Sequence, residues 1–554
     1  MSLLTQSAEH DRPAVRMKFR ALAALMLLVW LAVPNRAGAF ERWIYCAQNL
    51  WVDQNITNTI ALMERAAAAG YTHVLITDSK FGHLKDMDAR YFRNVDALKK
   101  AAQRLGLEIV PAVFPVGYSN DILYQNPDLV EGLPARDVPL VVSNGVASVV
   151  PDAAIVFPGG DFADLSRWSW KDPNVTADNG TAKVSNPNGN ARIVQHLKVR
   201  PFRQYHISTR VKTQDFQAPP NVMVLAGDHP LNFANLGIER TQDWKTHHVV
   251  FNSLTNTEVN VYFGVWGGTK GTLWWDDAKI EEVAFVNLIR RPGAPLMIRK
   301  EEGAGLVEAR DFTKLVDPLM GTKPWNGSYD VYHAPPALRT TLPDGTRLRA
   351  SWYHAMTVYD GQAMICPSEP QTMALLKDQA ERMHAAWGAR GYFMSHDEIR
   401  VMNWCAACEA RHMDAGEMLA DNVRQCTEIL RKVNPGGRIY VWSDMFDPHH
   451  NAHDNYFLVR GNLAGSWKGL DRDIVVVPWN YDQREASLKF FAGLGNAQLI
   501  AGYYDDDPAK ITNWLTAARP FPRIMGVMYT TWQNKYTDLE KFSKLVSDFP
   551  AAGK

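Results

Sequence analysis

The sequence predicts an α/β protein in which a (β/α)8 barrel of the TIM type is interrupted by an antiparallel β-sandwich of the jelly-roll type. Apolar strand-like runs alternate with amphipathic helical runs near both ends of the chain, which is typical of parallel strands joined by helices. Between about residues 151 and 283 the pattern changes to short period-two runs separated by turn residues, which is typical of a sandwich. A chain of 554 residues is also too long for one ordinary core.

Eight apolar runs are the expected barrel strands, and eight is the number that closes such a barrel. Three precede the sandwich and five follow it, at residues 42–46, 73–77, 107–114, 391–395, 438–442, 474–478, 497–503 and 524–530. Helices are expected at 57–69, where Gly70 ends an apolar stripe, at 95–105 and at 371–387. The run 347–353 could be a ninth strand, and we assign it to the insertion.

The domain boundaries follow from the same pattern. We expect a signal peptide at 1–39, a first part of the barrel at 40–150 and the sandwich at 151–285. An extended insertion at 286–365 and the second part of the barrel at 366–554 complete the chain.

The amino-terminal segment has the composition of a secretory signal peptide. Three basic residues, Arg16, Lys18 and Arg20, precede an apolar run at 21–33 that is short for a bilayer span, and small residues end it at Ala39. We expect cleavage near Ala39 and a secreted or periplasmic protein, with an uncleaved membrane anchor as the alternative. Basic and acidic residues balance at 59 each, so the charge gives no reason to expect a nucleic acid, or a membrane contact beyond the signal segment.

Five cysteines are too few, and odd in number, for a disulfide scaffold. Cys405 and Cys408 form a Cys-x-x-Cys pair, but a zinc site would need a second pair or histidines at ligand spacing, and none is evident in the sequence. We therefore expect no metal and no cofactor in the barrel. The pair is interpreted as structural, with one disulfide bridge left open.

Candidate site residues follow from the rule that catalytic groups of such barrels lie where strands run out into loops. Polar and aromatic residues stand at the expected strand ends: Arg42, Asp78, Asp397, Glu398, Trp442, Asp444, Trp479, Tyr503, Asp505 and Trp532. The strongest signal is the apolar strand 391–395, which runs into Asp397 and Glu398, because burial penalises two adjacent carboxylates unless they have a partner or a task. A solvated loop or a pair of metal ligands is the alternative.

A carboxylate pair of this kind suits hydrolysis of a glycosidic bond. That reaction needs an acid that protonates the leaving oxygen and a group that stabilises the cationic sugar. A neighbouring carboxylate and an apolar pocket can raise the pKa of one carboxyl and keep it protonated. Tryptophans fit the same chemistry, since the C–H face of a sugar stacks on a flat apolar ring.

The second half resembles the catalytic barrel of the family 20 glycoside hydrolases, the β-N-acetylhexosaminidases. The motifs occur in the family's order: Cys366-Pro367-Ser368-Glu369-Pro370, Tyr392 to Glu398, Val441-Trp442-Ser443-Asp444, 474–479, Leu499 to Asp505, and 526–532. Ser395-His396 replaces the paired glycines that precede the family's Asp-Glu, and Asn534 stands where a glutamate is usual.

The resemblance implies substrate-assisted catalysis. Glu398 would act as acid and base, Asp397 would orient the 2-acetamido group of the sugar, and Tyr503 would bind the acetamido carbonyl. The remaining expected ligands would wall the acetamido group or hold ring hydroxyls: Trp442, Trp479, Trp532, Arg42, Asp78, Asp444 and Asp505.

The inserted sandwich resembles jelly-roll carbohydrate-binding modules, on Gly160-Asp161-Phe162, Asp243-Trp244 and 271–277. Trp168, Trp170 and Trp266 are candidate stacking platforms, with a place in the core as the alternative. The resemblance leaves room for a structural calcium ion held in part by Asp161 and Asp277.

Three functions remain open. The leading one is an exported hydrolase of glycans, oligosaccharide or polysaccharide, that contain N-acetylhexosamine. The second is a retaining glycosidase with its own carboxylate nucleophile, for example Asp444 opposite Glu398. The third is a glycan-binding protein without catalysis.

Overall fold

Eight parallel strands form a closed barrel in the computed structural model, which describes residues 40–153 and 155–549. They are β1 (Glu41–Ala47), β2 (His73–Thr77), β3 (Glu108–Val113), β21 (Gly391–Met394), β23 (Arg438–Trp442), β25 (Val475–Val477), β26 (Ala497–Ile500) and β27 (Ile524–Tyr529). β27 pairs with β1 to close the barrel, and β3 pairs with β21 across the long insertion. All eight strands that the sequence predicted are confirmed. The signal peptide expected at 1–39 lies outside the described residues.

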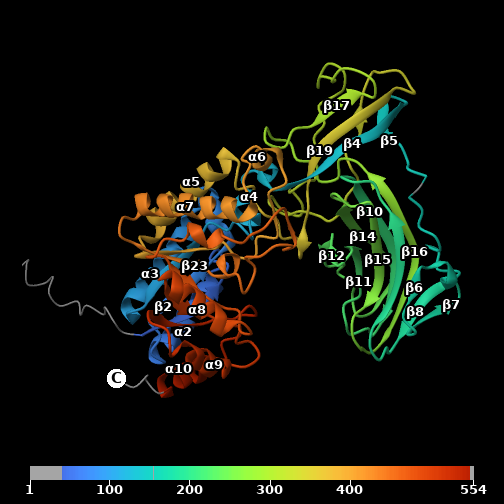
Figure 1. Ribbon diagram of the computed structural model, residues 1–554. Coiled ribbons are helices and arrows are strands. Elements are labelled where there is room, and N and C mark those ends of the chain that lie inside the picture. Colours follow the sequence, from blue (N-terminus) through green and yellow to red (C-terminus); the bar gives the residue numbers. More distant parts are fainter. Residues whose placement is uncertain (1–39, 154, 550–554) are drawn as a thin grey trace, which may run out of the picture. The chain divides into compact units, whose positions relative to one another are not determined.

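Helices follow most of these strands, and local signals set their ends. They are α2 (Asp53–Ala68), α3 (Ala89–Leu105), α4 (Asn120–Leu123), α5 (Pro370–Trp387), α6 (Ala406–Glu409), α7 (Ala415–Val433), α8 (Arg484–Leu494), α9 (Lys510–Ala518) and α10 (Leu539–Asp548). A capping box of Asp414 and Glu417 starts α7, and Gly106 in the left-handed region ends α3. Figure 1 shows the blue first part of the barrel together with the orange and red second part. Among the described residues no helix is long and apolar enough to cross a membrane.

Two antiparallel sheets of five strands each occupy the insertion, drawn from teal to green in Figure 1. The first has the order β14 (Gln242–Asn252), β10 (Gln204–Gln214), β16 (Thr272–Val283), β8 (Thr181–Ser185) and β7 (Val175–Asp178). The second has the order β12 (His229–Pro230), β11 (Asn221–Ala226), β15 (Glu258–Val265), β9 (Ala191–Lys198) and β6 (Trp170–Lys171). The rings of Phe263 and Trp275, one from each sheet, lie 5.5 Å apart. The jelly-roll assignment stays a prediction.

A third antiparallel sheet crosses the domain boundary that was predicted at residue 150. It consists of β17 (Met297–Lys300), β19 (Arg347–Ala355), β4 (Gly132–Ser143), β5 (Val146–Val149) and β18 (Leu338–Arg339). The run near residue 350 is therefore outside the barrel, as expected. However, β4 and β5 lie within 40–150, the range that the sequence assigned to the barrel. They form a hairpin across Asn144-Gly145, a local signal that the prediction did not use, and β4 also pairs with β19, which is more than 200 residues away. The pairs β13 (Phe233–Ala234) with β20 (Val358–Tyr359) and β22 (Val401–Met402) with β24 (Leu458–Val459) complete the sheets.

The interior of the barrel is packed with side chains. Trp43, Leu75, Val110, Phe393 and Leu499 belong to one buried cluster with residues of the other strands. A barrel filled in this way has no central pore, so any site must lie at an end where strands pass into loops.

Candidate active site

A cavity of about 540 Å³ lies at the carboxyl ends of the barrel strands. Side chains from β1, β2, β3, β21, β23 and the loops that follow several strands line it: Tyr45, Leu75, Thr77, Asp78, Ser79, Phe81, Ala112, Val113, Pro115, Tyr118, Asp121, Gln379, Phe393, Ser395, Asp397, Glu398, Trp442, Trp479 and Trp532. The size is that of a site for a small molecule or for one or two sugar rings. Six of the ten predicted site residues line this cavity: Asp78, Asp397, Glu398, Trp442, Trp479 and Trp532.

Aromatic rings form one wall of the cavity. The ring of Trp532 lies 6.0 Å from that of Trp442 and 6.5 Å from that of Trp479. Tyr45 on β1 packs edge-on against Trp532 at 5.1 Å. Trp442 is buried against Phe393, whereas Trp532 is 46% exposed and presents its ring to solvent. The wall therefore combines a buried ring, Trp442, with an accessible ring, Trp532, and the accessible ring can stack against an apolar face of a ligand.

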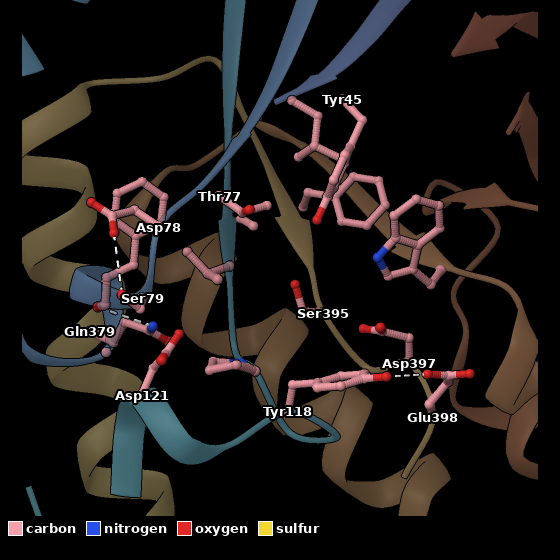
Figure 2. A pocket seen from close by; sticks show the side chains of 18 of the residues that line it. Tyr45, Thr77, Asp78, Ser79, Tyr118, Asp121, Gln379, Ser395, Asp397 and Glu398 are labelled. Carbon is pink, nitrogen blue, oxygen red and sulfur yellow. Dashed lines mark hydrogen bonds between the residues drawn. The ribbon is translucent and has the colours of Figure 1, made fainter. Parts of the chain in front are cut away.

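Glu398 is held by three contacts. The hydroxyl of Tyr118 donates a hydrogen bond to one carboxylate oxygen, and Figure 2 shows these two side chains pointing toward each other. The guanidinium of Arg400 lies 2.6 Å from the other carboxylate oxygen. The backbone N–H of Glu398 donates to the carboxylate of Asp444 at 2.8 Å. Both carboxylate oxygens of Glu398 are thus engaged by partners within the fold.

Asp397 carries a carboxyl group with a strongly raised pKa. Burial raises the pKa of Asp397 well above its ordinary value, and the negative charges of Asp444 and Glu398 raise it further. Burial also raises the pKa of Asp444 to about 7. The raised pKa of Asp397 favours its protonated form, and the expectation that one carboxyl of the pair stays protonated remains a prediction.

The loop that carries this pair is shaped by close backbone contacts. Glu398 has a left-handed φ of 49°, which is unfavourable for a residue with a side chain and must be imposed by neighbours. A Cβ atom on Gly117 would lie 1.7 Å from the carbonyl oxygen of Asp397, so only glycine fits there. The side-chain amide of Gln362 donates to the carbonyl oxygens of both Gly117 and Glu398. The loops after β3 and β21 are thereby fixed against each other.

A second group of polar side chains lies on another side of the cavity, as Figure 2 shows. The carboxylate of Asp78 accepts hydrogen bonds from Tyr91, from the N–H of Leu50 and from the N–H of Lys80, so it is fully used within the fold. Asp121 has no such partner among the described residues. Burial and the nearby Asp78 raise the pKa of Asp121 to about 7. Asp121 is thus the carboxyl group here that is free to bind a ligand hydroxyl.

Four predicted site residues do not line the cavity. Arg42 stands near the start of β1, at the opposite end of the strand from the loops, and its guanidinium donates to Ser543. The prediction mistook the first residue of the strand for its end. Tyr503 points its hydroxyl to the side chain of Gln533. Asp505 accepts the backbone N–H of Trp532 at 2.8 Å and so positions that ring instead of binding a ligand.

Asp444 is the fourth residue that the structure keeps out of the cavity. It is fully buried, and its carboxylate accepts the N–H of Glu398, the amide of Asn451 at 3.0 Å and the indole N–H of Trp479 at 3.4 Å. Because Asp444 is enclosed in this way and does not line the cavity, this geometry does not favour it as a nucleophile. The alternative in which Asp444 is the nucleophile stays a prediction. Its position makes it a support for both Glu398 and Trp479.

Sequence reasoning missed several residues of the site. Tyr118 follows β3 in a segment where the sequence analysis named no candidate, and Arg400 lies two residues beyond Glu398. Arg400 is also enclosed by the rings of Tyr359 and Phe457, at 4.8 and 5.0 Å. The alternation of charge in Asp397-Glu398-Ile399-Arg400 was a local signal for an ion pair. No local signal marked Tyr118, because it becomes a neighbour only when β3 pairs with β21.

The tryptophans of the insertion divide into two groups. Trp168 is buried, stacks on Phe162 and donates its indole N–H to the carbonyl of Gly159, so it belongs to the core. Trp170 and Trp266 are 48% and 41% exposed and remain candidate platforms. Asp277 is paired with Lys279 at 2.8 Å, and the predicted calcium ion stays a prediction.

One group of side chains in the described part of the chain could hold a metal ion. Glu131, Cys366, Cys405 and Cys408 place one ligand atom each within 4.8 Å of one another. All five cysteines are free thiols. The sequence showed no further ligands near Cys405 and Cys408, but the fold brings Glu131 and Cys366 beside them.

Comparison with known proteins gives distant likenesses only. No protein-family model and no curated protein matches the chain. Among solved structures, a pneumococcal exo-β-D-N-acetylglucosaminidase with tandem family 20 catalytic modules is 9% identical, with a TM-score of 0.34 over 92% of this chain and 83% of that one. The family 20 exo-β-N-acetylglucosaminidase of Vibrio harveyi is 9% identical, with a TM-score of 0.29 over 66% of this chain and 93% of that one. A rhamnosidase from Novosphingobium sp. PP1Y is 11% identical, with a TM-score of 0.31 over 90% of this chain but only 56% of that one. These values are too low to carry a function from those proteins to this chain.

Proposed function

We propose that this protein is a glycoside hydrolase that acts on glycans containing N-acetylhexosamine. One observation carries the proposal: Asp397 and Glu398 open into the same cavity as the rings of Trp442, Trp479 and Trp532. A sugar ring needs an apolar surface for its C–H face and polar groups for its hydroxyls, and this cavity offers both. An acidic pair at the reacting bond supplies the acid and the charge that glycoside hydrolysis requires.

In the proposed reaction the sugar's own acetamido group is the nucleophile. Glu398 gives a proton to the leaving oxygen as the bond from C1 to that oxygen breaks, and the acetamido carbonyl oxygen forms a new bond to C1. Water then attacks C1, breaks that bond and returns a proton to Glu398. Asp397 accepts the acetamido N–H and stabilises the positive charge that develops on the ring.

The resting geometry sets a condition on this mechanism. Glu398 is paired with Arg400 and Tyr118, while burial and the charges of Asp444 and Glu398 raise the pKa of Asp397. Because the two carboxyls are adjacent, a ligand that changes their surroundings can move a proton from Asp397 to Glu398. We propose that a bound leaving group displaces one contact of Glu398 and draws the proton to it. Tyr503 has no part in this version of the mechanism, because it does not line the cavity.

Hydrolysis of matched aryl glycosides tests the proposal. The substrates are pairs that differ only in having a 2-acetamido or a 2-hydroxyl group. Release of the aryl group from the acetamido substrates, and a decrease of kcat/KM by about 10²–10⁴-fold in Glu398→Gln, are the expected results. Glu381→Gln, an exposed substitution on α5, is the matched control and should retain full activity. Equal hydrolysis of both members of a pair would contradict the role of the acetamido group.

A glycan-binding protein without catalysis is the second candidate, and the engagement of both carboxylate oxygens of Glu398 favours it. It predicts that neither form hydrolyses any substrate. Glu398→Gln would then bind the same oligosaccharides as the wild type, as measured by isothermal titration calorimetry.

We further propose that the protein is exported and that its antiparallel sheets bind glycans. The exposed rings of Trp170 and Trp266 support the second point, because an accessible flat ring can stack on the C–H face of a sugar. Retention on an insoluble glycan that is lost in the Trp170→Ala, Trp266→Ala double variant would support this surface. Unchanged retention would exclude it.

A further inference from the structure

A closed cluster of three cysteines and one glutamate lies in the interior of the protein, away from the carboxylate pair. Glu131, Cys366, Cys405 and Cys408 are each at most 1% exposed. The sulfur of Cys366 lies 3.4 Å from that of Cys405 and 3.6 Å from that of Cys408, and Cys408 lies 3.4 Å from the Oε2 atom of Glu131. The proposed hydrolysis makes no use of this group.

We propose that these four residues bind a structural zinc ion. Zinc in structural sites takes four ligands in a tetrahedron, with bonds of about 2.3 Å to sulfur and about 2.0–2.2 Å to a carboxylate oxygen. A regular tetrahedron with those bonds puts two sulfurs about 3.8 Å apart and a sulfur and an oxygen about 3.6 Å apart. Three of the six separations, 3.4 to 3.6 Å, match this geometry within a few tenths of an ångström, and all four ligand atoms lie within 4.8 Å of one another.

The surroundings of Glu131 orient it for this task. Its Oε1 atom accepts the backbone N–H groups of Trp404 and Cys405, at 2.9 and 2.8 Å. Both bonds turn the other oxygen, Oε2, toward the sulfurs. Support of a ligand by hydrogen bonds from outside the coordination sphere is usual at metal sites, since it fixes the ligand's orientation.

The buried charge also calls for a cation. A carboxylate and thiols in a dry interior are costly unless they are paired or coordinate a metal. Arg291, itself 8% exposed, interacts with Cys366, Cys405 and Glu131, but it also forms an ion pair with Glu369. A disulfide would use two sulfurs and leave the third sulfur and the Oε2 atom of Glu131 without a shared cation. A zinc ion satisfies all four groups at once.

The four ligands come from three separate segments, which suggests what the ion stabilises. Glu131 directly precedes β4, where the chain leaves the barrel, and Cys366 lies just before α5, where the chain returns to it. Cys405 and Cys408 flank the start of α6, a few residues after Glu398. A zinc ion here would tie the two ends of the insertion to the base of the loop that carries the acidic pair.

Metal analysis of the purified full-length chain tests the site. The protein is produced in zinc-supplemented medium and purified without chelators, and zinc is measured by inductively coupled plasma mass spectrometry. One equivalent of zinc per chain is the expected result, with five titratable thiols after denaturation in the presence of a chelator. A chain without zinc, whether its thiols are free or Cys366 forms a disulfide with Cys405 or Cys408, overturns the proposal.

Variants and a spectroscopic probe identify the ligands. Cobalt(II) in place of zinc should give the intense visible bands of a tetrahedral site together with sulfur-to-metal charge-transfer bands. Cys408→Ser should lose the zinc and these bands, whereas Cys426→Ser, a buried cysteine of α7 outside the cluster, should keep both. Glu131→Gln should hold zinc at least about ten-fold more weakly in competition with a chelating dye.

If Cys408→Ser does not fold, the metal content and cobalt spectrum of the wild type still decide the question. Cobalt bands that are unchanged in both Cys408→Ser and Glu131→Gln would place the metal elsewhere and contradict the assignment. Because the readout is metal content, a failure here is independent of a failure to hydrolyse glycosides.

Discussion

The segment 397–408 contributes to two clusters of ionisable side chains, Asp397 with Glu398 and Cys405 with Cys408, and the surroundings of the two clusters differ completely. Asp397 and Glu398 open into a cavity of about 540 Å³, and Glu398 is compensated by Arg400. Glu131 and three cysteines lie in a dry interior beside Arg291. The first group has room for a sugar, and the second has room only for an ion. The comparison shows that an acidic group indicates function only when its access to solvent and its partners are known.

The largest expected effect is on the free energy of unfolding. It would be measured by substituting Arg291, beside the cysteines, and Arg400, beside Glu398. Arg291→Met leaves Glu369 buried without its cation and should lower the free energy of unfolding by about 3–5 kcal/mol. Arg400→Met should cost less, about 1–3 kcal/mol, because Glu398 is partly open to water. Urea unfolding followed by circular dichroism measures both. Arg390→Met, at an 82% exposed side chain, should change stability by less than about 0.5 kcal/mol. Equal losses of unfolding free energy in Arg291→Met and Arg400→Met would contradict the expected difference between the two sites.

The pH dependence of stability should come next in size and be traceable to Asp444. Burial raises the pKa of Asp444 to about 7 from 3.8, so the folded protein binds a proton in this range that the unfolded chain releases. Stability is therefore highest below about pH 4 for this group and is lost as the pH rises toward 7. Asp444→Asn removes this dependence, and thermal unfolding at several pH values measures it. A slope unchanged in the variant would show that Asp444 is not the titrating group.

A smaller effect is expected where the loops of the open site cross. Gly117→Ala forces a Cβ atom into the carbonyl oxygen of Asp397 and should cost about 1–3 kcal/mol of stability together with ligand binding. Gly493→Ala in α8, where nothing lies within 4 Å of the added atom, should instead stabilise the protein by about 0.5–1 kcal/mol. Differential scanning calorimetry of the two variants checks both signs. A harmless Gly117→Ala would mean that the two loops are not fixed against each other.

The smallest effect concerns the accessible edge of the aromatic wall. Trp532→Ala should raise KM, or the Kd of a bound oligosaccharide, by an amount that corresponds to about 0.5–1.5 kcal/mol, the contribution of one aromatic contact. Trp325→Ala removes a ring that is 65% exposed and does not line the cavity, and it should change neither constant. If both variants bind equally well, the wall does not contact the ligand.

Much of the barrel could be predicted because periodicity is a local property. Each of the eight strands shows itself as an apolar run between turn residues, and the structure places all eight within a few residues of the expected bounds. The Asp397-Glu398 pair was evident for the same reason, since two carboxylates directly after an apolar strand are conspicuous. Arg42 was wrongly predicted as a site residue, because it lies at the amino-terminal end of β1, whereas the cavity lies at the carboxyl ends of the strands.

Tertiary structure alone decided which side chains become neighbours. Tyr118 and Glu398 are 280 residues apart, and Cys408 and Glu131 are 277 residues apart, so no local pattern links them. The pairing of β3 with β21 brings the first two together, and the return of the chain after the insertion brings Cys366 to the second pair. The sequence by itself determined the strands and helices, because backbone periodicity depends on adjacent residues. The partners of each charged group depend on how distant segments pack, and burial and charge compensation follow from that packing alone.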